Sequence, residues 1–282
     1  MTMTEDVPVT AETSDGVMTI TLNRPDRGNG WTGPMSRGYL GKLDEAARSP
    51  DVRAIVVTGA GKAFCVGGDS EVLDGIAGSG EIPRADPDQP AVPSDHLYAI
   101  RVGKPVIAAV NGACFGIGMQ QVLACDIRIA SDEAKFATAF ARRGLAAEMA
   151  MSWLLPRLVG TGHATDLLLS GRLVRAPEAK EIGLVNRVVP HAELLNEAHA
   201  YALQLATKCA PSAMRTIKAQ MWRDMMSGLF EAYDRAGELM NATFVGEDFK
   251  EGVASWQQGR DPNFPALSGD EGLIDLSWAE RG

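Results

Sequence analysis

The stretch Thr58-Gly-Ala-Gly-Lys-Ala-Phe-Cys-Val-Gly-Gly-Asp69 decides the fold of this chain, because it links an apolar run to the start of a helix. The preceding run, Ala54-Ile-Val-Val57, is short and rich in β-branched residues, which is typical of a strand buried on both faces. Asp69 is a suitable N-cap for the helix that follows. Glycines such as Gly67 and Gly68 before a helix leave backbone N–H groups open to a ligand. The stretch therefore predicts either a tight turn or a site for a phosphate or a developing oxyanion.

The same order of strand, glycine-rich turn and helix occurs again further along the chain. Pro105-Val-Ile-Ala-Ala-Val110 predicts a second buried strand, and Asn111-Gly-Ala-Cys-Phe-Gly-Ile-Gly118 leads into a helix over residues 119–124. Two such turns can place two backbone donors around one point. The second turn is not a dinucleotide fingerprint, because a third glycine and the acidic residue after the next strand are missing.

The remaining pattern predicts an α/β part followed by a mostly helical C-terminal part. The segment from Gly75 to Pro93 is rich in Gly, Pro, Asp and Ser and predicts a long mobile loop, which either covers a site or is a tolerated insertion. The residues after Pro262 predict an extended tail. Further strands are expected over residues 17–22, 126–130, 135–137 and 183–188, and helices from residue 32 and over 164–169, 194–209, 212–226, 229–246 and 248–258.

Composition excludes several classes of function. A length of 282 residues fits one large domain or one domain with an appendage. A net charge of −9 without a Lys/Arg cluster argues against nucleic-acid binding, and no apolar run approaches a membrane span. The four cysteines have no metal-binding spacing, and the N-terminus does not resemble a signal peptide, so we expect a cytoplasmic protein with reduced thiols and no metal site. The four histidines are interpreted as surface or packing residues.

Seven motifs, in order, carry a resemblance to a known family. They are Leu22-Asn-Arg-Pro25, Ile55-Val-Val-Thr-Gly59, Gly61-Lys-Ala-Phe-Cys-Val-Gly-Gly-Asp69, Lys104-Pro-Val-Ile-Ala-Ala-Val-Asn-Gly112, Cys125-Asp-Ile-Arg-Ile-Ala130, Leu155-Pro-Arg-Leu-Val-Gly160 and Gly183-Leu-Val185. Together they resemble the crotonase superfamily, the enoyl-CoA hydratases and isomerases. The resemblance runs from about Val17 to Arg260, which is nearly the whole chain.

The resemblance implies a fold and an assembly. The fold would be the crotonase (ClpP-like) spiral of β-β-α turns, with a core over residues 1–197, a helical oligomerisation region over 198–268 and a tail over 269–282. Members of the family usually assemble as homotrimers or as hexamers made from two trimers. The substrate would be an acyl-CoA thioester, so coenzyme A arrives as part of the substrate and no separate cofactor is expected.

The resemblance also assigns an oxyanion hole. Two backbone N–H groups would hold the thioester oxygen, and by position they belong to Gly68 and Ile117. Each such donor contributes roughly 2.7–4 kcal/mol to transition-state stabilisation. Ile117 stands where hydratases commonly have glycine, but isoleucine keeps the N–H, so the hole can survive beside a tighter acyl pocket.

The positions of the family's catalytic carboxylates separate a hydratase from an isomerase. The two glutamates that hydratases use to activate water fall on Gln120 and Phe140, and neither of these side chains can take a proton at neutral pH. Glu148 falls where related isomerases carry their acidic residue. One carboxyl is enough for Δ3,Δ2-enoyl-CoA isomerisation, in which it takes a proton from C2 and returns one to C4. We therefore predict an isomerase with Glu148 as base and acid.

Three other interpretations remain open at this point. A 2-enoyl-CoA hydratase would use Gln120 and Glu148 to handle water, and a non-catalytic acyl-CoA binder would need neither. Glu148 can also be a carboxylate that stabilises a helix N-terminus without any chemistry.

The remaining site residues are expected to bind the rest of the substrate. Arg24, Arg27 and Lys62 are candidates for the phosphates of coenzyme A, as exposed cations beside turns. In the family's final helix, Trp256 fits the place of an aromatic residue that contacts a neighbouring subunit's ligand, and Arg260 would replace the usual lysine, which here is Gly259. The other predicted substrate contacts are Ala63, Val66, Gly67, Gly116 and Phe140.

Overall fold

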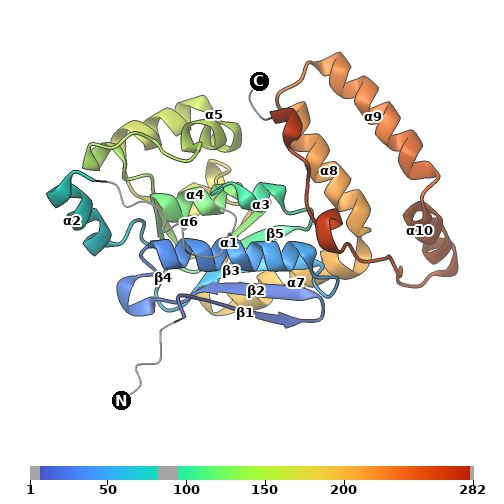
Figure 1. The fold of residues 1–282 in the computed structure, drawn as a ribbon, viewed down its shortest axis with the longest axis horizontal. Coiled ribbons are helices and arrows are strands. Elements are labelled where there is room, and N and C mark those ends of the chain that lie inside the picture. The colour runs from blue at the N-terminus through green and yellow to red at the C-terminus, as the bar shows by residue number, and fades with distance from the viewer. Residues whose placement is uncertain (1–6, 82–94, 280–282) are drawn as a thin grey trace.

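The computed structural model describes residues 7–81 and 95–279 (Figure 1). The strands are β1 Val9–Ser14, β2 Val17–Leu22, β3 Ala54–Gly59, β4 Ala63–Cys65, β5 Val106–Val110, β6 Ala113–Phe115, β7 Ile127–Ser131, β8 Lys135–Ala137, β9 Val174–Arg175 and β10 Arg187–Val189. The helices are α1 Gly33–Arg48, α2 Ser70–Ser79, α3 Tyr98–Arg101, α4 Ile117–Ala124, α5 Met151–Ser170, α6 Ala176–Glu181, α7 Leu194–Lys208, α8 Pro211–Asp224, α9 Leu229–Phe244 and α10 Glu247–Gln258. This mixture confirms the predicted α/β class.

The strands form two sheets. The larger has the order β1-β2-β3-β5-β7-β10 and the smaller the order β4-β6-β8-β9. The larger sheet is parallel except for the hairpin of β1 and β2, where Asp15 and Gly16 both have positive φ, as a tight turn between antiparallel strands requires. β3 and β5 are buried along their whole length because both of their faces are covered, which explains their continuous apolar sequence.

The chain repeats one supersecondary unit. β3 of the larger sheet is followed by β4 of the smaller sheet and by α2, and β5, β6 and α4 repeat this order. β7 and β8 then lead through a 3-10 turn, Ala141–Arg143, to α5. β4 and β6 are parallel neighbours, with Cys65 opposite Cys114. The two helices that follow these strands therefore begin side by side, which is the arrangement that the β-β-α spiral requires.

Helices cover both faces of the larger sheet. One core lies between α7 and residues such as Val56 and Ile107, and a larger core unites the other face with α1, α4 and α5. Figure 1 shows α2 and α5 at one end of the molecule and α9 and α10 at the other. The helices α8–α10 expose many large apolar side chains, including Leu229 and Phe230, each 80% exposed.

Several boundaries differ from the sequence-based expectations. The helix after Asp69 reaches Ser79, so the predicted loop from Gly75 begins as helix, and most of that loop, residues 82–94, lies outside the described residues. The strand predicted over residues 183–188 begins only at Arg187, as β10, because the residues before it form a turn. The predicted helix over 164–169 is the second half of α5, which breaks at Gly160.

The C-terminal segment is less extended than predicted. Gly103 donates a backbone hydrogen bond to Gly272, and Leu273 forms a bridge with Val102. Leu267 and Ile274 are buried. This segment therefore packs against the body of the protein. The division into regions 1–197, 198–268 and 269–282 stays a prediction. Within the described residues, no helix is long and apolar enough to cross a membrane.

Candidate active site

The first feature of the site is the backbone N–H of Gly68. Trp31 forms a parallel bridge with Gly68, in which Trp31 N donates to Gly67 O at 2.8 Å and Asp69 N donates to Trp31 O at 3.1 Å. Both hydrogen bonds use the neighbours of Gly68, so its own N–H points away from Trp31. Among the described residues this N–H has no backbone acceptor.

The second donor lies at the start of α4. Ile117 is the first residue of that helix, and the first N–H groups of a helix have no acceptor within it. Gly116 has a φ of 50° and Gly67 a φ of 98°, conformations that favour glycine. A Cβ on Gly116 would lie 3.8 Å from Gly67 Cα, so the two turns are in contact. The structure thus brings the two predicted donors together.

These donors line one small cavity of about 170 Å³. We call it the donor pocket, and define it by Trp31, Gly68, Leu73, Gly116, Ile117, Thr138, Ala139, Phe140, Arg143, Leu145 and Glu148. Its wall combines residues from α2, the start of α4 and the segment between β8 and α5. Most of the lining side chains are apolar, and Glu148 and Arg143 are the charged ones.

Glu148 supplies the acidic group of the donor pocket. It precedes α5 in an irregular turn in which Met149 and Ala150 have positive φ and Glu148 O accepts from Met151 N at 2.9 Å. Its carboxyl has no hydrogen bond or ion pair within the described part of the chain. The side chain is exposed on one side, yet burial on the pocket side raises the pKa of the carboxyl. A helix dipole would lower this pKa, so a purely helix-stabilising carboxylate is the weaker interpretation.

The other two positions of interest differ from each other. Phe140 is buried and lines the donor pocket as an apolar wall. Gln120 is fully buried on α4 and is not among the lining residues. Its Oε1 accepts from Gln121 Nε2 at 2.7 Å, and its Nε2 donates to His96 O at 3.3 Å. Both ends of the Gln120 amide are therefore occupied by protein groups.

Comparison with known proteins identifies the family. The sequence model described as enoyl-CoA hydratase/isomerase matches residues 12–266. The chain belongs to the enoyl-CoA hydratase/isomerase family.

Relatives of this chain include proteins named as hydratases and a protein named as an isomerase. A Thermus thermophilus protein named "Putative enoyl-CoA hydratase" is 37% identical over 252 residues, covering 88% of this chain and 97% of the relative. A Streptococcus mutans trans-2-decenoyl-[acyl-carrier-protein] isomerase is 30% identical over 250 residues, covering 89% of this chain and 95% of the relative. Similar proteins are therefore named as hydratases and as isomerases.

Solved structures agree on the fold. A crystal structure described as a probable enoyl-CoA hydratase/isomerase from Mycobacterium abscessus is 34% identical, with a TM-score of 0.82 over 92% of this chain and 99% of that one. The predicted crotonase fold of this enoyl-CoA hydratase/isomerase family member is thereby confirmed.

Asp69 braces the turn that carries the first donor. It caps α2 by accepting from Glu71 N at 3.0 Å, and it pairs with Arg24 at 2.9 Å and Arg27 at 3.3 Å. Burial alone would raise the pKa of Asp69, but the hydrogen bonds from Arg24, from the Glu71 amide and from Arg27 bring it below its usual value. Arg24 was expected to be an exposed cation, and it is instead partly buried as part of this brace.

The expected coenzyme A contacts lie outside the donor pocket. Lys62 is exposed between β3 and β4 and has no ion pair in the described ranges, whereas Arg27 is paired with Asp69 and Glu71. Ala63 is buried in β4, and Val66 follows that strand with its N–H bonded to Gly28 O. Lys62 is therefore the freer of these cations for a phosphate.

Trp256 and Arg260 lie far from the donor pocket within one chain. Trp256 is on α10 and is 82% exposed, and α10 lies at the opposite end of the molecule from α2 and α5 (Figure 1). Arg260 forms an ion pair with Glu251. Any contact between these residues and an acyl-CoA would thus involve another copy of the chain.

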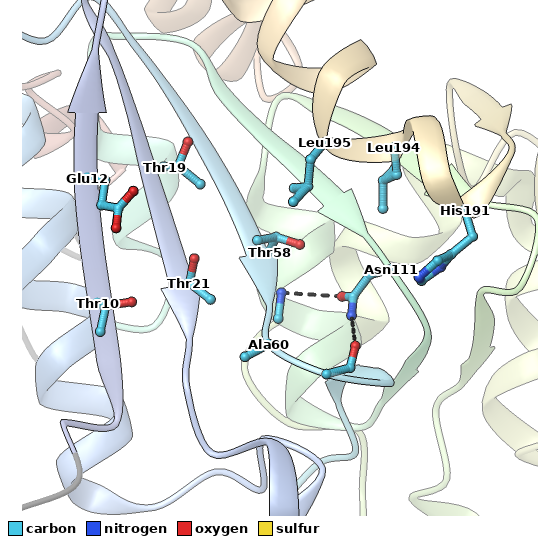
Figure 2. A pocket seen from close by; sticks show the side chains of 12 residues that line it. Thr10, Glu12, Thr19, Thr21, Thr58, Ala60, Asn111, His191, Leu194 and Leu195 are labelled. Atoms are coloured by element: carbon cyan, nitrogen blue, oxygen red, sulfur yellow. Dashed lines mark hydrogen bonds between the residues drawn. The ribbon is translucent and has the colours of Figure 1, made fainter.

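A larger hollow of about 440 Å³ lies elsewhere, on the larger sheet (Figure 2). We call it the threonine groove, and define it by Thr10, Glu12, Thr19, Thr21, Thr58, Gly59, Ala60, Gly61, Asn111, His191, Leu194 and Leu195. None of the predicted site residues lines it. Asn111 accepts from Gly59 N at 3.3 Å and donates to Gly61 O at 3.0 Å, as the dashed lines in Figure 2 show.

Sequence reasoning missed part of the donor pocket. Trp31, Leu73 and Arg143 were not among the predicted site residues. Leu73 follows the glycine motif within α2, and Arg143 lies between Phe140 and Glu148. The pair Arg142-Arg143 before Gly144 was a possible signal, since cations next to a turn often face a ligand.

Proposed function

We propose that this protein isomerises 3-enoyl-CoA thioesters to 2-enoyl-CoA thioesters. The observation that carries the proposal is that Glu148, an unpaired carboxyl with a raised pKa, shares the donor pocket with the Gly68 and Ile117 turns. The two positions at which hydratases of the family carry glutamate are Gln120 and Phe140. One acidic group and one oxyanion hole are what a proton shift between two carbons needs.

The mechanism follows from the positions of these groups. Glu148 removes a proton from C2 of the 3-enoyl thioester, and the electron pair moves into the thioester carbonyl. The N–H groups of Gly68 and Ile117 hold the negative oxygen of this dienolate. Glu148, now protonated, donates to C4 as the double bond forms between C2 and C3. A raised pKa suits this group, because it must both take and return a proton near neutral pH.

The apolar wall supports isomerisation over hydration. Phe140, Leu73 and Ile117 leave little polar surface to hold a water molecule beside C3. Hydration remains the second candidate because several relatives have names of hydratases. It would need Glu148 to activate water and Gln120 to orient it, and the Gln120 amide is already bonded to Gln121 and His96.

A matched pair of substrates separates these candidates. The purified protein is given hex-3-enoyl-CoA and, separately, hex-2-enoyl-CoA, and the products are identified by chromatography and mass spectrometry. We expect isomerisation of the first to exceed hydration of the second. Faster hydration would favour a hydratase, and tight binding of both esters without turnover would favour a non-catalytic acyl-CoA binder.

We further propose a homotrimer, or a hexamer made from two trimers. The support is that α8–α10 expose many large apolar side chains, among them Leu229, Phe230 and Trp256, and exposed apolar surface is typical of interaction sites. Light scattering on the purified protein should give a mass of three or six chains, and Leu229→Asp should reduce it. A monomer at micromolar concentration would overturn this assembly.

A further inference from the structure

One cation in the donor pocket has no role in the isomerisation described above. Arg143 is the last residue of the 3-10 turn Ala141–Arg143, and its backbone N donates to Phe140 O at 2.9 Å. The turn ends at Gly144 in the left-handed conformation, and Arg143 lines the donor pocket from this turn. Its guanidinium has no hydrogen bond or ion pair to any described residue.

The neighbouring arginine of the same turn differs in its contacts. Arg142 Nε donates to Ser170 O at 2.7 Å, at the C-terminal end of α5. Arg142 does not line the donor pocket. Two adjacent arginines of one turn thus differ: one is tied to the fold and the other is available to a ligand.

Arg143 is not the counter-ion of Glu148. An ion pair between them would lower the pKa of the carboxyl, whereas burial raises it and no neighbouring cation contributes. The two side chains therefore line the same pocket without forming an ion pair. Arg143 is exposed to solvent and lines the donor pocket, whereas Lys62 lies outside it, so the Arg143 guanidinium is accessible to a group that enters the pocket.

We propose that Arg143 binds a carboxylate carried by the acyl group, so that the substrates are short enoyl-CoA thioesters with an acid at the far end. A guanidinium binds a carboxylate through two parallel hydrogen bonds, which a neutral alkyl end cannot replace. A cavity of about 170 Å³ is small compared with typical ligand sites of about 300–1,000 Å³, so the acyl group is short. This proposal rests on the proposed function, because it assumes that the donor pocket receives the acyl group.

The test compares two saturated esters that cannot react. Dissociation constants of adipoyl-CoA, which ends in a carboxylate, and of hexanoyl-CoA, its neutral match, are measured by calorimetry with the wild type, Arg143→Met and Arg142→Met. We expect the wild type to prefer adipoyl-CoA, and Arg143→Met to reduce this preference about 10- to 100-fold. Arg142→Met should leave the preference unchanged, and Arg143→Lys should restore part of it.

Other outcomes overturn the proposal. If Arg143→Met weakens both esters equally, Arg143 contacts the coenzyme A phosphates or only supports the fold. If the wild type shows no preference for adipoyl-CoA, Arg143 does not bind a carboxylate at the end of the acyl group. Because binding needs no turnover, a preference that depends on Arg143 can stand even if isomerisation of hex-3-enoyl-CoA is never observed, so the two proposals fail separately.

Discussion

The donor pocket and the threonine groove differ in what their polar groups are doing. The groove is larger, about 440 Å³ against about 170 Å³. Its two most buried polar side chains are already bonded: Thr58 donates to Ala109 O at 2.9 Å, and Asn111 bonds to Gly59 and Gly61. In the pocket, Glu148 has no protein partner among the described residues. Glu12 of the groove also has no side-chain partner among these residues, so the difference is one of combination. Only the pocket joins an unpaired carboxyl to the N–H groups of Gly68 and Ile117, and this combination, rather than volume, identifies the place where chemistry can occur.

The two regions also sit at different kinds of position in the fold. The threonine groove lies across strands, where Thr10 faces Thr21 and Thr21 faces Thr58 in register, so its polar row belongs to a regular sheet. The donor pocket lies where helices begin after β4 and β6, and helix starts leave N–H groups unpaired. The following predictions test this contrast, from the largest expected effect to the smallest.

Of the four predictions that test this contrast, removing one donor should have the largest effect. Ile117→Pro deletes the N–H at the first position of α4, where proline is tolerated, and also replaces the side chain that lines the pocket. We expect kcat for isomerisation of hex-3-enoyl-CoA to fall about 10²–10³-fold. Ile117→Leu keeps the N–H and serves as the control. Equal activity of the two variants would show that this N–H does not hold the thioester oxygen.

The pH profile should report the state of Glu148. The base must be ionised, so kcat/KM should fall about tenfold per pH unit as the pH drops below the pKa of its carboxyl. Because burial raises this pKa, the acidic limb should lie above 4.5, the usual value for glutamate. Rates measured from pH 4 to 9 with hex-3-enoyl-CoA locate the pH at which kcat/KM begins to fall. A limb at or below 4.5 would contradict the raised pKa.

Asp69 should matter for stability through the turn that holds Gly68. Asp69→Ala removes the cap of α2 and leaves Arg24 without its carboxylate partner. We expect the free energy of unfolding in urea to fall by about 1–3 kcal/mol. Asp69→Asn retains the capping oxygen and should lose less. If both substitutions leave unfolding unchanged, Asp69 does not brace this turn.

A change in the threonine groove should have the smallest effect. Thr21→Val removes one hydroxyl from the middle of its row and keeps the shape of the side chain. We expect kcat/KM to change by less than about twofold, as for a surface substitution away from the site. A tenfold loss would mean that the groove takes part in the reaction.

The sequence predicted the fold well where an element depends on residues close to it in the chain. The apolar runs of β3 and β5, the N-cap Asp69 and the glycines before α4 all act within a few residues, so their pattern shows directly in the sequence. The family resemblance added the order of the spiral. The packing of Leu267 and Ile274 depends on contacts between distant segments, and the sequence pattern did not indicate it.

The site was predictable to a similar extent. Gly68, Ile117 and Glu148 were assigned from motifs, and they line one pocket. Arg143 was missed because its importance comes from having no partner, a property that appears only when the surrounding side chains are placed. Arg24 was misjudged as exposed for the converse reason, since its partner Asp69 is 45 residues away in sequence.

The most direct test of the single-carboxyl mechanism is hydrogen exchange at C2 of hex-3-enoyl-CoA in D₂O, followed by mass spectrometry with the wild type and Glu148→Gln. The wild type should exchange the C2 protons and form hex-2-enoyl-CoA. Glu148→Gln should bind hexanoyl-CoA as before, yet lose both exchange and isomerisation by about 10²–10⁴-fold. Exchange at the wild-type rate in Glu148→Gln would show that another group moves the proton and would contradict the account.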